Sequence, residues 1–242
     1  REIWVELGDA VRVGDAWRDF PAFGDGWLEV RRGRGPPAVA AGYREVLVDR
    51  AEPRIGDTVL VLGVGPVGLS AIAFARAAGA GRVLAIGGPA LRLEAALAVG
   101  ADAVFDLAAG DVAARLAFVL EQTEGRGADI TIEAAGAPNA AVEAQQFTRD
   151  AGRVVVVGQY TDHGSTPWNP HLDLNKKHLD VRGCWGSDYS HFYRGARWLA
   201  DDARGAPWDA IVLQRFSLEE CNEALAAVEQ GSVIKALVDP QA

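Results

Sequence analysis

Residues 57–80 read DTVLVLGVGPVGLSAIAFARAAGA, and this stretch decides the fold. Its first part, DTVLVLG, is a short apolar run that ends in glycine, as is typical of a strand buried in a parallel sheet. GVGPVG interrupts the run, and the alanine-rich LSAIAFARAAGA predicts a helix that Gly79 closes. The stretch therefore predicts a strand, a glycine turn and a helix in direct succession.

The same alternation continues along the chain. Further apolar runs predict strands, and the segments between them have helical patterns. The strands are expected at 82–86, 102–106, 128–134, 152–158 and 179–186, and the helices near 90–99, 111–123 and 138–148. Strands that alternate with helices of this length imply right-handed crossovers and a parallel sheet covered on both faces. The sequence thus predicts an α/β fold with a doubly wound parallel sheet.

Both ends of the chain depart from this alternation. Residues 1–37 are richer in Gly, Pro, Arg and Trp, and their first part predicts strand, turn and strand. From residue 206 onward the pattern predicts strand, helix and strand, with Ser217 and Glu220 as the capping box of that helix and Gly231 at its end. We expect residues 38–205 to form one domain, and residues 1–37 and 206–242 to form a second, mostly β unit.

Composition limits the possible partners and compartments. The 242 residues carry a formal net charge of −9, which argues against a nucleic-acid partner. No apolar run is long enough to span a membrane, and the chain does not open with a signal peptide, so we expect a cytoplasmic protein. The two cysteines, Cys184 and Cys221, lie far apart, which argues against a disulfide framework and a cysteine-built zinc site. The absence of methionine indicates a sequence that does not begin at its biological start or lacks segments.

The motif with the most chemistry is Gly63-x-Gly65-x-x-Gly68. The first glycine permits the tight turn, the second lets the backbone approach a pyrophosphate, and the third lets helix and strand pack closely. Pro66 and Val67 open the helix, whose N-terminus offers free amides and the positive end of its dipole to phosphates. The motif predicts dinucleotide binding; the alternative is a purely structural turn.

Several stretches carry a resemblance to a known family. They are GDTVLVLGVGPVGL, RLEAALAVGAD, GRGADITIEAAGAP, GRVVVVGQY, RFSLEECNEALAAVEQGSVIKALVDP and, more weakly, LDVRGCWGS. In these stretches, which cover residues 54–242 almost without a break, the chain resembles the medium-chain dehydrogenase/reductase superfamily of the zinc-binding alcohol dehydrogenase type. The resemblance implies an NAD(P)-dependent oxidoreductase with a Rossmann domain for the cofactor and a second domain for substrate and zinc.

The first part of the chain departs from that family. Typical members have a catalytic domain of well over a hundred residues before the glycine motif, whereas here 62 residues precede Gly63 and contain neither Cys nor His. We therefore expect an abbreviated, GroES-like remnant of the catalytic domain, no bound zinc and zinc-independent chemistry. The four histidines show no ligand spacing with a partner, so we interpret them as loop residues. They are His163, His171, His178 and His191.

The second predicted strand ends without the acid that usually holds an NAD ribose. Gly87 stands where an Asp or Glu would repel a 2′-phosphate, so a glycine leaves room for that phosphate. Arg92, one helical turn on, could pair with it. This pattern favours NADP over NAD, although Arg92 also suits an ordinary solvated helix face.

The nicotinamide is expected beyond the carboxyl ends of the fourth and fifth strands. The residues expected to line it there are Ala135, Gly136, Gly158 and Gln159. Two nearby clusters offer proton donors, from which we take Tyr160, His163, Tyr189 and His191 as catalytic candidates. The clusters also contain Asp162, Asp188 and Tyr193, and their alternative role is structural: Ser187 or Ser190 could cap a helix, and the aromatic rings could simply pack.

Two classes of function fit these observations. The first is an oxidoreductase that transfers hydride between nicotinamide and a carbonyl or an activated alkene of a small-molecule substrate. The second is a non-redox enzyme or cofactor-binding protein on a reduced dehydrogenase scaffold, and fold alone does not decide between them. In either case we expect a homodimer, because in the family the sixth strand, here residues 179–186, commonly pairs with its twofold mate.

Overall fold

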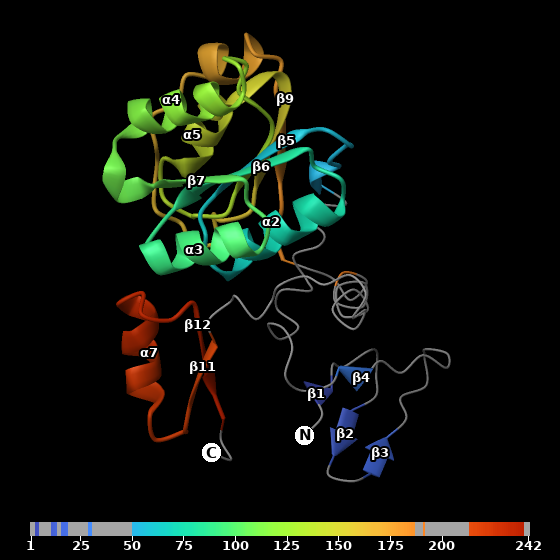
Figure 1. The fold of residues 1–242 in the computed structure, drawn as a ribbon, viewed down its shortest axis with the longest axis vertical. Coiled ribbons are helices and arrows are strands. Elements are labelled where there is room, and N and C mark those ends of the chain that lie inside the picture. Colours follow the sequence, from blue (N-terminus) through green and yellow to red (C-terminus); the bar gives the residue numbers. More distant parts are fainter. Residues whose placement is uncertain are drawn as a thin grey trace.

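The computed structural model describes residues 3–4, 11–13, 16–18, 29–30, 50–186, 191 and 213–239. Its centre is a sheet of six strands that all run parallel (Figure 1). In spatial order these are β10 (Asp180–Gly183), β9 (Thr148–Val156), β8 (Ala128–Glu133), β5 (Thr58–Leu62), β6 (Arg82–Gly87) and β7 (Ala103–Asp106). The chain winds outward in one direction from β5 and in the other from β8, so the expected doubly wound α/β fold is confirmed.

Two helical layers cover the sheet. Helices α2 (Pro66–Ala77) and α3 (Ala90–Ala98) lie on one face, and α4 (Val112–Gln122) and α5 (Ala140–Phe147) lie on the other (Figure 1). Side chains alternate along each strand, so β5 sends its valines into the core under α2 and α3 and its leucines into the core under α4 and α5. The all-apolar strand that the sequence predicted is thus buried on both faces.

The helices begin and end close to their predicted limits. Asp111 caps α4 by accepting a hydrogen bond of 3.0 Å from the N–H of Ala114. Helix α5 starts two residues later than predicted, at Ala140, and ends at Phe147. Among the described residues no helix is both long and apolar enough to cross a lipid bilayer.

Two strands differ from their predicted limits by more than one residue. Strand β9 starts at Thr148 rather than at residue 152, because Thr148 pairs with Ala128 and the chain then bulges before Arg153 pairs with Ile130. Ala151, with φ of 54°, lies within that bulge. Strand β10 ends at Gly183, three residues short of the predicted end.

The ends of the chain form smaller pieces of structure. Near the N-terminus, β1 (Ile3–Trp4) pairs antiparallel with β4 (Glu29–Val30), and β2 (Val11–Val13) with β3 (Ala16–Arg18). Near the C-terminus, β11 (Leu213–Phe216) and β12 (Lys235–Val238) are parallel and joined by α7 (Cys221–Glu229). The division into residues 1–37 with 206–242 and residues 38–205 stays a prediction.

The capping prediction for α7 holds in part. The Glu220 carboxylate accepts a hydrogen bond of 2.8 Å from the N–H of Ser217, which is one half of a capping box, but the helix itself starts only at Cys221. Gly231 follows the end of the helix with φ of 72°, the left-handed conformation expected of a helix-ending glycine. Ile234, a few residues later, is buried in the core under α2 and α3.

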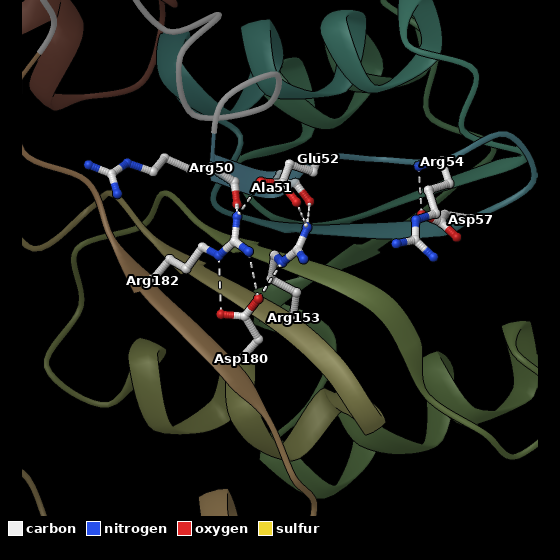
Figure 2. A network of polar contacts seen from close by, with 8 residues as sticks. All are labelled: Arg50, Ala51, Glu52, Arg54, Asp57, Arg153, Asp180 and Arg182. Atoms are coloured by element: carbon white, nitrogen blue, oxygen red, sulfur yellow. Dashed lines mark hydrogen bonds and ion pairs between the residues drawn. The ribbon is translucent and has the colours of Figure 1, made fainter.

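A network of charged side chains holds residues 50–52, which precede β5, against the sheet (Figure 2). Arg153 and Arg182 each form ion pairs with both Glu52 and Asp180 at 2.8–3.2 Å, and each donates a hydrogen bond to a backbone carbonyl of residues 50–51. A hydrogen bond from Arg182 is the main reason why the pKa values of Glu52 and Asp180 lie below their usual range. The network ties residues 50–52 to the two strands at one edge of the sheet.

Candidate functional site

The glycine turn lies at the carboxyl end of β5, next to the point where the strand order reverses. Gly63 has φ of 96°, and its N–H donates a hydrogen bond of 2.8 Å to the carbonyl of Ile86 on β6. A Cβ at Gly63 would lie 2.7 Å from the backbone nitrogen of Ala135, so only glycine fits between the ends of β5 and β8. The turn therefore sits in the crevice where open α/β sheets bind ligands.

The other two glycines of the motif have different surroundings. A Cβ at Gly68 would lie 1.8 Å from the carbonyl oxygen of Gly63, so this glycine lets α2 pack directly on the turn. A Cβ at Gly65 would meet no atom within 4 Å, so the described protein atoms do not explain why this position is glycine. The open space over Gly65 is what a backbone approached by a pyrophosphate requires.

Helix α2 begins directly at this open space. Gly65 is its N-cap in an extended conformation, Pro66 is its first residue, and its first turn has no acidic side chain. Pro66 and Val67 are partly exposed. The early amides of a helix have no partner within the helix, and with the helix dipole they favour an anion at this place.

The turn after β6 forms the neighbouring wall. Arg92 lies in the first turn of α3, and its Nε is buried with no hydrogen-bond partner among the described residues. A buried donor without a partner is costly and rare, so this nitrogen is suited to an acceptor that binds from outside the protein.

The side chain of Val64 lies against Gly87. Gly87 is buried, and a Cβ there would lie 2.4 Å from Cγ2 of Val64. Close contact with Val64 is therefore enough to account for the glycine, and the room for a 2′-phosphate beside Gly87 stays a prediction. The sequence could not show this contact, because it depends on how the turn after β5 folds against β6.

Asp106 is a carboxylate at this site that the sequence analysis missed. It ends β7 opposite Gly87, and a Cβ at Gly88 would lie 3.5 Å from its Oδ1. The same Oδ1 accepts a hydrogen bond of 2.9 Å from the N–H of Ala108. Its position at the carboxyl end of a predicted parallel strand was the signal that could have found it.

The loops after β8 and β9 meet at the expected nicotinamide end. A Cβ at Gly136 would lie 2.4 Å from the carbonyl oxygen of Gly158, so the two loops touch backbone to backbone. The Gln159 side chain donates a hydrogen bond of 2.9 Å to the carbonyl of Ala137. The structure thus brings together Ala135, Gly136, Gly158 and Gln159, as the sequence suggested.

Glu133 lies beneath these loops and was also missed from the sequence. It ends β8, is fully buried, and accepts hydrogen bonds from the N–H groups of Ala135, Gly136 and Gly158. An acidic residue at the end of a predicted central strand was the feature that could have revealed Glu133. Its apolar neighbours made it look like part of the core.

The proposed proton donors are placed unequally. Tyr160 is half exposed, its ring stacks on that of Trp185 at 4.8 Å, and its hydroxyl oxygen accepts a hydrogen bond of 3.1 Å from the N–H of Gly186. His163 is exposed in the loop after β9. His191 is buried, with 5% of its surface exposed. The remaining candidate, Tyr189, lies outside the described residues, as do Asp188, Tyr193, Ser187 and Ser190.

Comparison with known proteins identifies the family. The family model for zinc-binding dehydrogenases matches residues 66–201, which is more than half of the chain. The chain belongs to the zinc-binding dehydrogenase family. This assignment confirms the resemblance to the medium-chain dehydrogenase/reductase superfamily that the sequence motifs suggested.

Curated relatives of this chain match most of its length. It is 35% identical over 204 residues to a 5-exo-hydroxycamphor dehydrogenase of Pseudomonas putida, covering 84% of this chain and 55% of the relative. It is 31% identical to an erythritol/L-threitol dehydrogenase of Mycolicibacterium smegmatis, covering 81% of this chain and 53% of that one. The chain therefore spans about half the length of the curated relatives it matches.

Solved structures of dehydrogenases share the fold. An alcohol dehydrogenase from Thermotoga maritima superposes with a TM-score of 0.74 at 29% identity, covering 83% of this chain and 54% of that one. A zinc-binding dehydrogenase from Sinorhizobium meliloti, solved with NADP bound, has a TM-score of 0.73 at 27% identity, covering 83% and 57%.

The family model is that of zinc-binding dehydrogenases, so the chain raises the question of a zinc site. A catalytic zinc ion needs about three protein ligands that converge on one point. Within the part of the chain that the structure describes, no group of three His, Cys, Asp or Glu side chains could hold a metal ion. The side chains of the described residues therefore do not fit a zinc site.

Proposed function

We propose that this chain is the cofactor-binding part of an NAD(P)-dependent oxidoreductase that transfers hydride between nicotinamide and a carbonyl or an activated alkene. The observation that carries the proposal is the open space over Gly65, at the free N-terminus of α2 and at the reversal of strand order. This arrangement suits a pyrophosphate, and the relatives named above are dehydrogenases. The bound cofactor would supply the hydride, while the chain binds and orients it.

We favour NADP over NAD because of Arg92. Its buried Nε without a partner supports an anionic or acceptor group at the start of α3, and a 2′-phosphate is such a group. The Asp106 carboxylate near Gly88 is an opposing influence, since it would repel a phosphate and could accept a hydrogen bond from a ribose hydroxyl. The preference for NADP is therefore expected to depend on Arg92.

Calorimetric titration with NADPH and NADH tests both proposals. Arg92→Ala is expected to lower NADPH affinity about tenfold and NADH affinity by less than about threefold, because only NADPH loses a charge-assisted hydrogen bond. Arg126→Ala is a matched control, since Arg126 is exposed on the loop before β8 and outside the proposed site. Binding should persist in EDTA, because we propose that this chain carries no zinc.

Three results would count against these proposals. If the wild-type chain binds neither cofactor, the dinucleotide proposal is wrong. If Arg92→Ala weakens NADPH and NADH equally, Arg92 does not contact a 2′-phosphate. Tight binding without any NADPH oxidation across carbonyls and enones would favour the non-redox alternative.

We propose Tyr160 as the proton donor to the carbonyl oxygen, on which negative charge develops as hydride adds to the carbonyl carbon. Its oxygen accepts a hydrogen bond from the N–H of Gly186, so its own proton stays available, and it is half exposed at the carboxyl edge. In a screen for NADPH oxidation with EDTA present, Tyr160→Phe should lower turnover by about 10²-fold or more and leave NADPH affinity unchanged. Equal turnover in both proteins would move the role to another candidate, of which His191→Ala is the next variant.

We also propose a homodimer through β10. Among the described strands β10 pairs only with β9, so its other side is an open edge, and Val181 on it is 41% exposed. Light scattering at micromolar concentration is expected to give twice the chain mass, and Val181→Lys to shift the protein toward monomer. A wild-type monomer would contradict the proposal.

A further inference from the structure

Glu133 is a fully buried carboxylate at the end of β8, in the centre of the sheet between β5 and β9. Its Oε1 accepts hydrogen bonds from the N–H groups of Ala135 at 2.8 Å and Gly136 at 2.7 Å. Its Oε2 accepts a hydrogen bond from the N–H of Gly158 at 3.2 Å. One side chain thus holds the loop after β8 and the loop after β9 at the same time.

These contacts fix the surface on which a cofactor would rest. The loop after β8 also abuts the glycine turn, because the backbone at Ala134 and Ala135 lies where a Cβ of Gly63 would be. The two loops touch directly at Gly136 and Gly158, and their spacing is set by this contact, by the hydrogen bonds from Val157 and Gly158 to the backbone carbonyl of Glu133, and by the carboxylate below them. Burying a carboxylate costs several kcal/mol unless hydrogen bonds replace its hydration, and here three donors do so.

We propose that Glu133 is a positioning residue for the nicotinamide half of the dinucleotide. It holds residues 134–136 and 158–159 in the arrangement that receives the ring, and it does not touch the reacting atoms. The adenine half lies elsewhere, along β6 and the start of α3, and does not depend on Glu133. This inference rests on the proposed function, because it presupposes a dinucleotide in this crevice.

The Glu133→Gln variant removes only part of the hydrogen bonding between this side chain and the two loops. A glutamine oxygen can still accept the hydrogen bonds from Ala135 and Gly136, but its NH₂ group would then face the N–H of Gly158, and two donors repel. The loop after β9 therefore loses its side-chain contact and keeps only the hydrogen bonds from the N–H groups of Val157 and Gly158 to the backbone carbonyl of Glu133, at 2.9 and 3.0 Å, while the loop after β8 keeps both of its contacts. Glu133→Asp keeps the carboxyl group but shortens the side chain by one methylene, which moves the carboxyl oxygens away from the N–H of Gly158.

The test compares a whole cofactor with a fragment that lacks nicotinamide. The 242-residue chain is titrated with NADPH and with 2′-phospho-ADP-ribose, and with NADH and ADP-ribose as the second pair. Glu133→Gln is expected to lower the affinity for the whole cofactor about tenfold and to leave that for the fragment within about twofold. The fluorescence change of the bound dihydronicotinamide should weaken in parallel. Glu143→Gln is the matched control, because its carboxylate bonds Arg115 on α4 rather than these loops, and it should change neither affinity.

Each outcome decides the inference. Equal losses for cofactor and fragment, or no loss for either, would show that Glu133 has only a structural role and would overturn it. If Glu133→Gln does not fold, Glu133→Asp must show the same selective loss, and an unselective loss there overturns the inference as well. If the wild-type chain binds the fragment but shows no added affinity for the whole cofactor, the inference fails while the dinucleotide proposal stands. If the wild type binds neither, the proposed function fails and this inference falls with it.

Discussion

Gly68→Ala is expected to unfold about 5–10 °C below the wild-type chain, which corresponds to about 1–3 kcal/mol. Its new methyl group would lie 1.8 Å from the carbonyl oxygen of Gly63, so α2 must move away from the turn after β5. The higher helix propensity of alanine offsets the loss by about 1 kcal/mol at most. Since α2 contributes many fully buried residues to one of the two cores, the displacement cannot be confined to the surface.

Gly65→Ala, in the same motif, is expected to behave in the opposite way. A Cβ at Gly65 meets no atom within 4 Å, so the midpoint of thermal unfolding should stay within about 2 °C of the wild type. The methyl group would instead occupy the space into which we propose that the pyrophosphate binds, and NADPH affinity should fall at least about tenfold.

Thermal unfolding and calorimetric titration of the two variants separate the two roles. A Gly65→Ala variant that binds NADPH as tightly as the wild type would contradict a pyrophosphate at this turn. A Gly68→Ala variant of unchanged stability would show that the turn and α2 can separate at little cost.

The fold could be predicted because its signals are local. Strand β5, the turn and α2 follow one another directly in the sequence. The apolar periodicity of the strand and the helix and the spacing of the three glycines can therefore be recognised within one short stretch. The bulge before Arg153 was missed for the opposite reason: it arises from the pairing of β9 with β8, which is separated from it by α5. Strand limits follow pairing partners, whereas helix limits follow caps such as Asp111.

The site was predicted less completely than the fold. Residues expected around the nicotinamide do lie together, but the carboxylate that joins them was not found, because Glu133 and Gly158 are 25 positions apart. Gly87 was interpreted through the acidic residue that it replaces, but a Cβ at this position would also lie too close to Val64. Contacts across a parallel sheet bring together the ends of strands far apart in sequence, and periodicity within one segment carries no information about them.

At the opposite end of the sheet, Asp129 joins three strands through its side chain. Its Oδ2 accepts a hydrogen bond of 2.8 Å from the N–H of Thr58 at the start of β5, and its Oδ1 accepts one from Nε of Arg149 in the bulge of β9. Burial raises the pKa of Asp129, but these hydrogen bonds and the charges of Arg149 and Arg126 outweigh it, so its pKa lies below the ordinary value. The pKa values of Glu52 and Asp180, in the network of Figure 2, are lowered as well.

The stability of the chain is therefore expected to fall in acid. A carboxylate whose folded pKa lies below its unfolded value contributes stability that is complete above the unfolded value, near pH 4, and is lost as the pH falls through the folded value.

Asp129→Asn should lower the free energy of unfolding by about 1–3 kcal/mol at pH 7, because the new NH₂ group faces a donor from Thr58 or from Arg149. The free energy of unfolding of this variant should also fall less steeply than that of the wild type between about pH 5 and pH 3, because the variant lacks one of these three carboxylates with lowered pKa. Asp111→Asn is the control at neutral pH, since asparagine caps α4 as well as aspartate does. Urea unfolding at a series of pH values measures both quantities, and curves for Asp129→Asn and the wild type that stay parallel down to about pH 3 would show that Asp129 does not link folding to protonation.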